Sequence, residues 1–212
     1  MAGMAQFPDK YFDLAIVDAP YGINLDSWDK SIPDDIYFYE LFRISKRQMI
    51  FGGNYYNLPH TQGWICWDKT FNEYLRGKSL STNQIKKENI SEFELIWTSF
   101  LKKARFVRYM NLGNLQGFDE NIKVDYDKKP KIHICEKPVA LYRWLLQHYA
   151  KPGDKIIDTH VGSASSFIAF EWEGFFDYVG FELDKDYYHD AQNRLETWRE
   201  RHFGQYKLAL AV

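Results

Sequence analysis

Residues 151–165 read KPGDKIIDTHVGSAS, and this stretch decides the fold. The apolar residues before Asp158 are typical of a short buried strand, and Gly162 allows a sharp turn into a helix with close backbone approach to a ligand. A second apolar run, 178–181, ends in Glu182, which follows Asp158 by 24 positions. A strand, a glycine turn, a helix and a second strand that ends in a carboxylate predict a nucleotide-binding α/β unit. A turn with a purely structural role is the alternative interpretation.

The remaining chain alternates strand-like and helix-like segments around this unit. Strands are predicted at 12–18, 48–53, 63–68, 93–98, 105–109, 155–158 and 178–182, and helices at 31–46, 138–149, 163–172 and 184–202. Right-handed crossovers then predict an α/β fold with a doubly wound, mostly parallel sheet, whose ligands bind at the C-terminal ends of the strands. The length predicts a single domain over residues 1–212, in which residues 69–131 lose the regular pattern and form a small insertion.

Composition excludes several classes of protein. Hydrophobic residues make up 45% of the chain, which suffices for a packed core, and no apolar stretch approaches the roughly 18 residues of a membrane span. We therefore expect a soluble protein, and a cytoplasmic one because residues 1–6 lack the pattern of a secretory signal. Cys66 and Cys135 lack the spacing of zinc ligands or of a disulfide framework, so we expect no metal site.

Charge is distributed unevenly along the chain. The formal net charge is −2, but residues 69–131 contain 13 Lys and Arg against 8 Asp and Glu, a net charge of +5 against −7 elsewhere. A basic segment of this kind suits a polyanionic partner. The alternative is a solvated face without a partner.

A second informative stretch follows the apolar run 12–17 and reads Asp18-Ala19-Pro20-Tyr21-Gly22. Its position at the end of a buried strand places the Asp18 carboxylate at the edge of the sheet where ligands bind. Proline and glycine are also turn formers, so the stretch taken alone favours a turn that merely ends a strand.

Three stretches resemble motifs of the beta class of DNA amino-methyltransferases. Residues 18–21 are similar to the catalytic motif (Asp/Asn/Ser)-Pro-Pro-(Tyr/Phe), with Ala19 in place of the first proline. Residues 133–138, HICEKP, are similar to the element His-Pro-Thr-Gln-Lys-Pro. Residues 158–165 are similar to the cofactor loop Asp-Pro-Phe-x-Gly-Ser-Gly-Thr, with Ala164 in place of its second glycine. The catalytic motif precedes the cofactor loop, as in that class, so the resemblance also implies a circularly permuted order of motifs.

The resemblance implies an enzyme that uses S-adenosylmethionine (AdoMet). The implied cofactor-binding residues are Lys137, Pro138, Asp158, Thr159, Val161, Gly162, Ser163, Glu182 and Leu183, and His133 belongs to the same set of motifs. Amides at the start of the helix after Gly162 would meet the carboxylate of AdoMet, and Glu182 would accept both ribose hydroxyls. The implied catalytic residues are Asp18, Ala19, Pro20 and Tyr21.

The implied reaction is methylation of an exocyclic amine of a base in double-stranded DNA. Such an amine is a poor nucleophile, and acceptors that hold both of its hydrogens favour the pyramidal nitrogen that can attack a methyl group. In the family these acceptors are the first side chain of the motif, here Asp18, and a backbone carbonyl, while the ring at the position of Tyr21 stacks on the base. Asp at the first position favours adenine N6 over cytosine N4. The base must be flipped out of the duplex to reach this site.

The basic segment 69–131 lies where beta-class enzymes keep their target-recognition region. Its implied DNA-binding residues are Lys102, Lys103, Arg105 and Arg108, and the basic residues Lys128, Lys129 and Lys131 follow further along the chain. Because the segment is short, we expect a short recognition site or a homodimer.

Two other interpretations stay open. Ala19 and Ala164 depart from the family patterns, so a catalytically weak module that binds AdoMet or DNA is one alternative. A methyltransferase for an amide nitrogen of RNA or protein is the other, because such enzymes use a similar tetrapeptide. Their cofactor motif usually comes first in the chain, unlike the order found in this sequence.

Overall fold

The computed structural model describes residues 2–24, 29–69, 91–112, 115–118, 123–124 and 136–209. The chain divides into two compact units. The first unit comprises Met1–Asp18, Tyr39–Lys46 and Pro130–Val212, and the second comprises Ala19–Phe38 and Arg47–Lys129. Each unit is described by itself.

The first unit is built on three parallel strands in the order β1 (Phe12–Val17), β8 (Ile156–Asp158) and β9 (Tyr178–Gly180). The register pairs Leu14 with Ile156, and Asp158 with Gly180. All three residues of β8 are buried, as expected of a strand with neighbours on both edges and layers on its faces. This arrangement brings the C-terminal ends of the three strands to the same edge.

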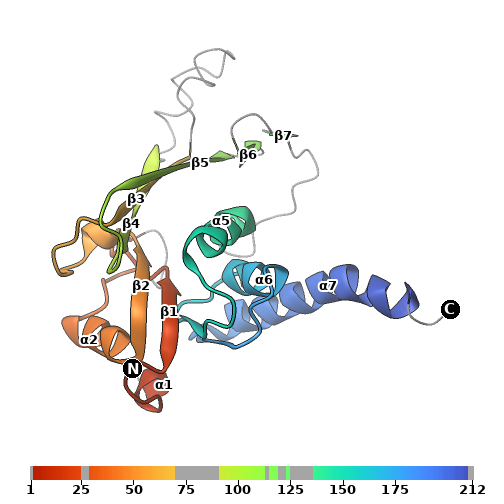
Figure 1. The fold of residues 1–212 in the computed structure, drawn as a ribbon, viewed down its shortest axis with the longest axis horizontal. Helices are drawn as coiled ribbons and strands as arrows, with labels where there is room; N and C mark the ends of the chain where they lie inside the picture. The colour runs from red at the N-terminus through yellow and green to blue at the C-terminus, as the bar shows by residue number, and fades with distance from the viewer. Residues whose placement is uncertain are drawn as a thin grey trace. The chain divides into compact units, whose positions relative to one another are not determined.

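Among the described residues, the helices that lie wholly within the first unit are α1 (Ala2–Ala5), α5 (Val139–Tyr149), α6 (Ser165–Trp172) and α7 (Lys185–Ala209). Helix α5 packs against α6, and α7 runs past α6 toward the C-terminus (Figure 1). Leu141, Leu145 and Leu146 are completely buried on one face of α5, which confirms the predicted periodicity of that segment.

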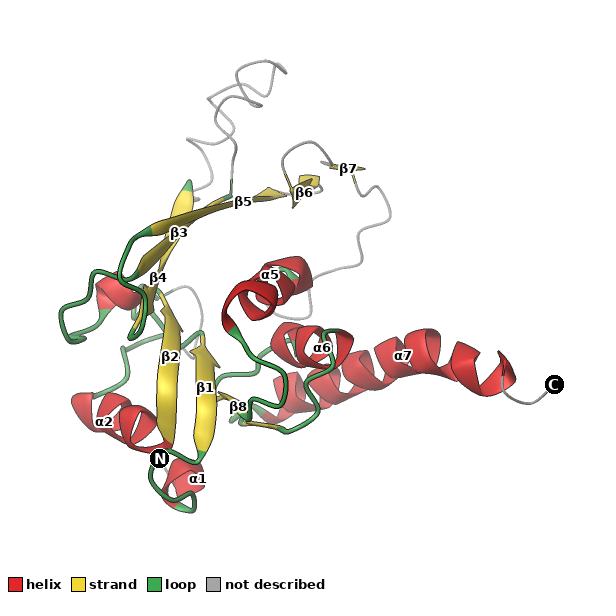
Figure 2. Ribbon diagram, viewed as in Figure 1, coloured by secondary structure: helices red, strands yellow, loops and turns green. Residues whose placement is uncertain are grey.

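The second unit contains most of the remaining strands (Figure 2). Their order is β7 (Lys123–Val124), β6 (Leu115–Phe118), β5 (Arg105–Leu112), β3 (Trp64–Asp68), β4 (Phe93–Thr98) and β2 (Ser45–Phe51). Strands β3 and β5 are parallel, whereas the β2/β4, β3/β4, β5/β6 and β6/β7 pairs are antiparallel. The boundary between the units falls within α2 (Asp35–Ile44) and within β2.

The α/β fold class predicted from the sequence is confirmed, and the strand directions are more mixed than predicted. Strand β4 lies between β2 and β3, so the described part of segment 69–131 belongs to the sheet of the second unit. Helix α2 begins at Asp35 rather than at Ser31, because the Asp34 side chain accepts a hydrogen bond from the Tyr37 amide at 2.8 Å and caps the helix there. The division of the chain into a domain with an insertion stays a prediction.

Two successive glycines end β2 and lead into η1 (Gly53–Tyr55). Gly52 has φ +63°, and a Cβ atom there would overlap the ring of Tyr21. A Cβ atom at Gly53 would overlap the side chain of Trp97. Close packing therefore requires glycine at both positions, and the left-handed backbone favours it at Gly52 as well. Among the described residues, no helix is both long and apolar enough to cross a membrane.

Candidate functional site

The loop after β8 is organised by the carboxylate of Asp158. This side chain is completely buried. Its Oδ1 accepts a hydrogen bond from the His160 amide at 3.0 Å, and its Oδ2 accepts one from the Ser166 hydroxyl at 2.6 Å. Asp158 thus ties the start of the loop to the first turn of α6.

Burial raises the pKa of Asp158 from its ordinary value of 3.8 to about 7. The hydrogen bonds from Ser166 and from the His160 amide lower this pKa but do not offset desolvation, and the nearby negative charges of Asp18 and Glu182 raise it further. A carboxyl group that is ready to ionise near neutral pH, close to two other carboxylates, suits a site for a cation.

Glu182 follows β9 and holds the other side of the loop. Its Oε2 accepts a hydrogen bond from the Gly162 amide at 2.9 Å, and its Oε1 accepts one from the Asp184 amide at 2.9 Å. A carboxylate offers about four lone-pair sites, so these two bonds leave acceptor capacity for a diol. The next residue, Leu183, is 94% exposed. An exposed apolar side chain beside an acceptor carboxylate fits a nucleoside, which joins a flat apolar ring to two hydroxyls.

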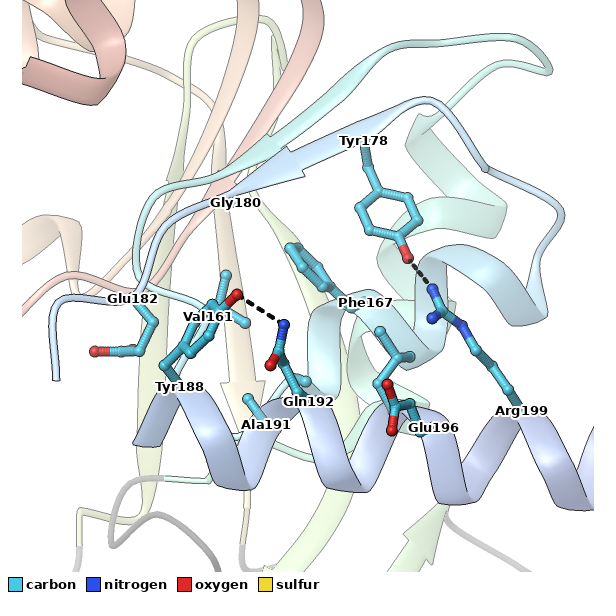
Figure 3. Close-up of a pocket in the computed structure, with 12 residues that line it drawn as sticks. Val161, Phe167, Tyr178, Gly180, Glu182, Tyr188, Ala191, Gln192, Glu196 and Arg199 are labelled. Atoms are coloured by element: carbon cyan, nitrogen blue, oxygen red, sulfur yellow. Dashed lines mark hydrogen bonds between the residues drawn. The ribbon is translucent and has the colours of Figure 1, made fainter. Parts of the chain in front are cut away.

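A cavity of about 330 Å³ lies beside this carboxylate in the first unit (Figure 3). Its apolar lining includes Val161 and Phe167, and Glu182 lies at one end of it. At the other end the Arg199 guanidinium donates a hydrogen bond to the Tyr178 hydroxyl at 3.1 Å. The volume is at the lower end of the range of about 300–1,000 Å³ for small-molecule sites. Of the predicted cofactor-binding residues, Val161 and Glu182 line the cavity.

The turn into α6 has a strained residue at its end. Gly162 has φ +54° and Ala164 has φ +61°, so both lie in the left-handed region. Ala164 stands where the family pattern has its second glycine, and an alanine in this conformation costs about 1–3 kcal/mol. The loop therefore has the backbone that a glycine pattern predicts, although one of the two residues is not glycine. Thr159 and Ser163 are buried in the same loop.

Lys137 pairs with the predicted catalytic carboxylate. Its Nζ lies 2.7 Å from Asp18 Oδ2, and the two side chains are only 8% and 15% exposed. Pro138, next to Lys137, is the N-cap residue of α5. A buried ion pair of this kind fixes the orientation of the carboxylate. The motif predicts that Lys137 binds the cofactor, and this stays a prediction; in the structure its ammonium group pairs with Asp18.

Arg194 contacts the loop before α6, and the sequence did not predict this role. From α7 it donates hydrogen bonds to the Ser163 carbonyl at 2.8 Å and to the Ser165 hydroxyl at 3.1 Å, and it lies 3.0 Å from Glu136. It joins the predicted cofactor loop to the segment that holds Lys137. No local signal marks this residue, because its partners are distant along the chain.

The rest of the tetrapeptide belongs to the second unit, where two buried side chains anchor its backbone. The Tyr56 hydroxyl donates a hydrogen bond to the Ala19 carbonyl at 2.7 Å and lies 3.2 Å from the Pro20 carbonyl. Asp29 is 1% exposed, and its carboxylate accepts hydrogen bonds from the amides of Gly22 at 2.8 Å and Ile23 at 3.2 Å. Sequence reasoning missed both Tyr56 and Asp29.

The ring of Tyr21 is held by its neighbours in the second unit. It stacks on Tyr55 at a centroid distance of 4.8 Å and an interplanar angle of 10°. Its hydroxyl donates to Glu94 Oε2 at 3.4 Å, and Glu94 Oε1 lies 2.9 Å from the Lys69 ammonium group. Together with Gly52, these contacts fix the orientation of the Tyr21 ring, the aromatic member of the predicted catalytic tetrapeptide.

The four predicted DNA-binding residues lie before and on β5 in the second unit, and all four are exposed. The Arg108 guanidinium lies 5.2 Å from the centroid of the Phe106 ring, and its Nε is 3.8 Å from Asp68 Oδ2. Side chains alternate between the two faces of a strand, so Arg105 and Arg108 project from opposite faces of β5. The structure therefore does not bring all four residues to one face.

Several predicted residues lie outside the described part of the chain. They are His133, Lys128, Lys129, Lys131 and Cys135. Among the residues that the structure does describe, no group of three or more His, Cys, Asp or Glu side chains is arranged to hold a metal ion.

Comparison with protein families gives a match to the family N6_N4_Mtase, described as DNA methylase, over residues 36–193. A search of curated proteins found no significant match.

Solved structures with a similar fold include three DNA methyltransferases or putative modification methylases. The M1.HpyAVI complex with SAM is 20% identical, covers 87% of this chain and 90% of its own, and has a TM-score of 0.54. The putative DNA modification methylase TTHA0409 from Thermus thermophilus, in complex with S-adenosyl-L-methionine, is 17% identical to this chain. It covers 93% of this chain and 90% of its own, and has a TM-score of 0.53. PvuII DNA methyltransferase, which is cytosine-N4-specific, is 12% identical to this chain. It covers 93% of this chain and 88% of its own, and has a TM-score of 0.55.

Proposed function

Because the chain belongs to the DNA methylase family whose model matches residues 36–193, we propose that it methylates an exocyclic amine in double-stranded DNA at a specific site, with adenine N6 favoured over cytosine N4. One observation carries this proposal. The first unit places Asp18, Asp158 and Glu182 at or just beyond the C-terminal ends of the neighbouring parallel strands β1, β8 and β9. Ligands of open α/β sheets bind at this edge.

AdoMet is the cofactor of this family, and when bound it supplies an electrophilic methyl group on a sulfonium ion. The residues present fit it. Glu182 offers acceptors for the ribose hydroxyls, and the exposed Leu183 offers an apolar contact for the adenine ring. The amides that follow Gly162 open α6 and suit the carboxylate of the methionine part. Asp158, buried between the other two carboxylates, makes the loop favourable for a cationic ligand.

Asp18 is proposed to act on the target amine. Its carboxylate accepts a hydrogen bond from the amine, so that the nitrogen lone pair leaves conjugation with the ring and attacks the methyl carbon. A nitrogen–carbon bond forms, the sulfur–carbon bond breaks, and its electron pair stays on sulfur. The nitrogen then carries a positive charge, which the Asp18 carboxylate stabilises until one proton leaves this nitrogen for water. Lys137 keeps the carboxylate oriented and does not itself react.

Tyr21 is proposed to hold the target base. Because the amine of a paired base is hidden in the duplex, the base is flipped out and stacks on an aromatic surface. Tyr21 supplies this surface, and Tyr55, Gly52 and Glu94 keep its ring in place. The exposed residues Lys102, Lys103, Arg105 and Arg108 are proposed to contact DNA phosphates. Homodimer formation and cytoplasmic residence remain predictions from the sequence.

Incubation of the protein with labelled AdoMet and unmethylated duplex DNA, followed by digestion and nucleoside analysis, tests the function. N6-methyladenine in the digest supports the proposal, and N4-methylcytosine would correct the base but not the reaction. Parallel reactions with RNA and with protein distinguish amide methylation. Binding of AdoMet without transfer to any of these substrates would identify the chain as a binding module.

Replacing Glu182 with Gln is expected to weaken AdoMet binding by about 1–3 kcal/mol, because a charge-assisted acceptor for the ribose is lost. Calorimetric titration measures the affinity. Glu173→Gln is a matched control on the same unit, because Glu173 pairs with Arg143 away from the cofactor loop. An unchanged affinity in Glu182→Gln would remove this residue from the cofactor site.

AdoMet affinity is expected to rise with pH through about pH 7, because the cationic cofactor favours the ionised form of Asp158, whose pKa is about 7. Between pH 6 and pH 8 the gain is roughly tenfold at most. The effect of the raised pKa on protein stability has the opposite pH dependence from its effect on AdoMet affinity. Since the pKa of Asp158 is raised in the folded protein, its contribution to the free energy of unfolding is fully present below about pH 4 and is lost as the pH rises through 7. Calorimetric titration with AdoMet at a series of pH values tests the expected rise in affinity.

In Asp158→Asn the rise of AdoMet affinity with pH should disappear. The same rise in that variant would assign the pH dependence to another group.

A further inference from the structure

We propose that Tyr56 is a positioning residue that holds the backbone of the predicted catalytic tetrapeptide, so that the Ala19 carbonyl is presented to the target amine in a fixed orientation. This inference rests on the proposed function and names a residue that the sequence motif does not contain. It concerns the chain's own backbone, so part of it can be tested in the free protein.

The hydrogen bond from Tyr56 is buried and has ordinary strong geometry. The distance of 2.7 Å between its hydroxyl and the Ala19 oxygen is typical of an O–H···O bond. The Pro20 oxygen lies 3.2 Å from the same hydroxyl. One hydroxyl therefore faces two successive carbonyls and fixes the orientation of the peptide between them. A carbonyl oxygen has two lone pairs, so the Ala19 oxygen can accept a second hydrogen bond from an amine.

Tyr56 is itself held rigidly. It follows η1 directly and is only 8% exposed. Its ring lies 5.0 Å from that of Phe38 and 6.3 Å from that of Tyr21, measured between centroids. A hydroxyl on a packed ring positions its partner with little loss of side-chain entropy on binding.

The tetrapeptide needs an external anchor at this point. Ala19 does not fix its own φ angle as a proline would. On the C-terminal side of Tyr21, the Asp29 carboxylate already accepts hydrogen bonds from the amides of Gly22 and Ile23. On the N-terminal side, where the acceptor carbonyl of Ala19 lies, the Tyr56 hydroxyl supplies the corresponding hydrogen bond. Loss of this bond would allow the Ala19–Pro20 peptide to rotate, and a displacement of about 1 Å at a reacting group costs on the order of 100-fold in rate.

The test uses Tyr56→Phe, which removes only the hydroxyl. Two effects are expected: faster amide hydrogen exchange in the peptide that covers residues 17–23 of the free protein, and a kcat for methyl transfer lower by about 10- to 100-fold. The calorimetric Kd for AdoMet should change by less than about threefold, because the cofactor residues lie elsewhere in the chain. Tyr39→Phe is the control, since it removes the hydroxyl of an exposed tyrosine on α2 that lies outside the proposed site.

A second substitution separates positioning from a general structural role. Ala19→Pro restrains φ at the anchored residue, and in the Tyr56→Phe background it should restore most of the lost kcat and of the lost exchange protection. A fold defect would lower the melting temperature and the AdoMet affinity together, and Ala19→Pro would restore neither. Unchanged exchange in residues 17–23 of Tyr56→Phe overturns the inference whether or not the protein methylates DNA. If the wild-type protein transfers no methyl group, the proposed function fails while the exchange measurement still decides whether Tyr56 anchors the loop.

Discussion

Replacing Asp18 with Ala is expected to lower kcat for methyl transfer by about 10²- to 10⁴-fold, while AdoMet binding stays nearly intact. The physical reason is that the carboxylate acts on the amine of the target base and stabilises the positive charge that develops there. The groups proposed to hold the cofactor follow β8 and β9, whereas Asp18 follows β1. Asp18→Asn keeps one acceptor oxygen and should lose less activity than Asp18→Ala.

The ion pair with Lys137 determines how this experiment is controlled. Truncation of Asp18 leaves a nearly buried ammonium group without its carboxylate, which costs about 3–5 kcal/mol of stability. The double variant Asp18→Ala/Lys137→Met removes both charges and keeps the fold comparable with the wild type. Asp177→Ala serves as a surface control, because Asp177 is largely exposed and pairs with Lys155.

Single-turnover kinetics with saturating AdoMet gives the rate of transfer, and calorimetry gives the affinity for AdoMet. Transfer at the wild-type rate in the double variant would remove Asp18 from the mechanism. A parallel loss of AdoMet affinity in all Asp18 variants would instead assign this carboxylate to the cofactor.

The geometry of the loop after β8 could be predicted from the sequence because its determinants are local. An apolar strand, a glycine and a carboxylate at the end of the next strand lie within one supersecondary unit. Gly162 and Glu182 are joined by a hydrogen bond across 20 positions, a separation that a strand–helix–strand unit brings together. The left-handed conformation of Ala164 shows that the loop geometry is retained where the sequence departs from the glycine pattern.

The contacts that organise the catalytic tetrapeptide could not be predicted in this way. Lys137 lies 119 positions from Asp18, Glu94 lies 73 positions from Tyr21, and Tyr56 lies 37 positions from Ala19. Each contact depends on strand pairing that hydrophobic periodicity does not specify. Strand directions could not be predicted for the same reason, since apolar runs such as β3 and β4 read alike in parallel and antiparallel sheets.

Neutralising Lys102, Lys103, Arg105 and Arg108 together is expected to reduce the salt dependence of DNA binding strongly. Each phosphate contact contributes about 0.9 to the slope of log affinity against log salt concentration, so four contacts would lower the slope by up to about 3.6. AdoMet affinity should not change. The motivation is the net charge of +5 in residues 69–131 and the exposure of all four side chains.

The positions of the four basic residues allow their separate contributions to the salt dependence to be measured. Because Arg105 and Arg108 project from opposite faces of β5, one duplex surface does not contact both equally. Single Arg105→Gln and Arg108→Gln variants and the pair Lys102→Gln/Lys103→Gln should therefore divide the total slope change unequally, and the larger share identifies the face that meets DNA. Lys185→Gln/Arg201→Gln on α7 removes two exposed charges elsewhere and controls for net charge. Titrations with a short duplex at several salt concentrations give the slopes. Equal slopes for the wild type and the quadruple variant would place the DNA surface elsewhere and make these four residues a solvated face.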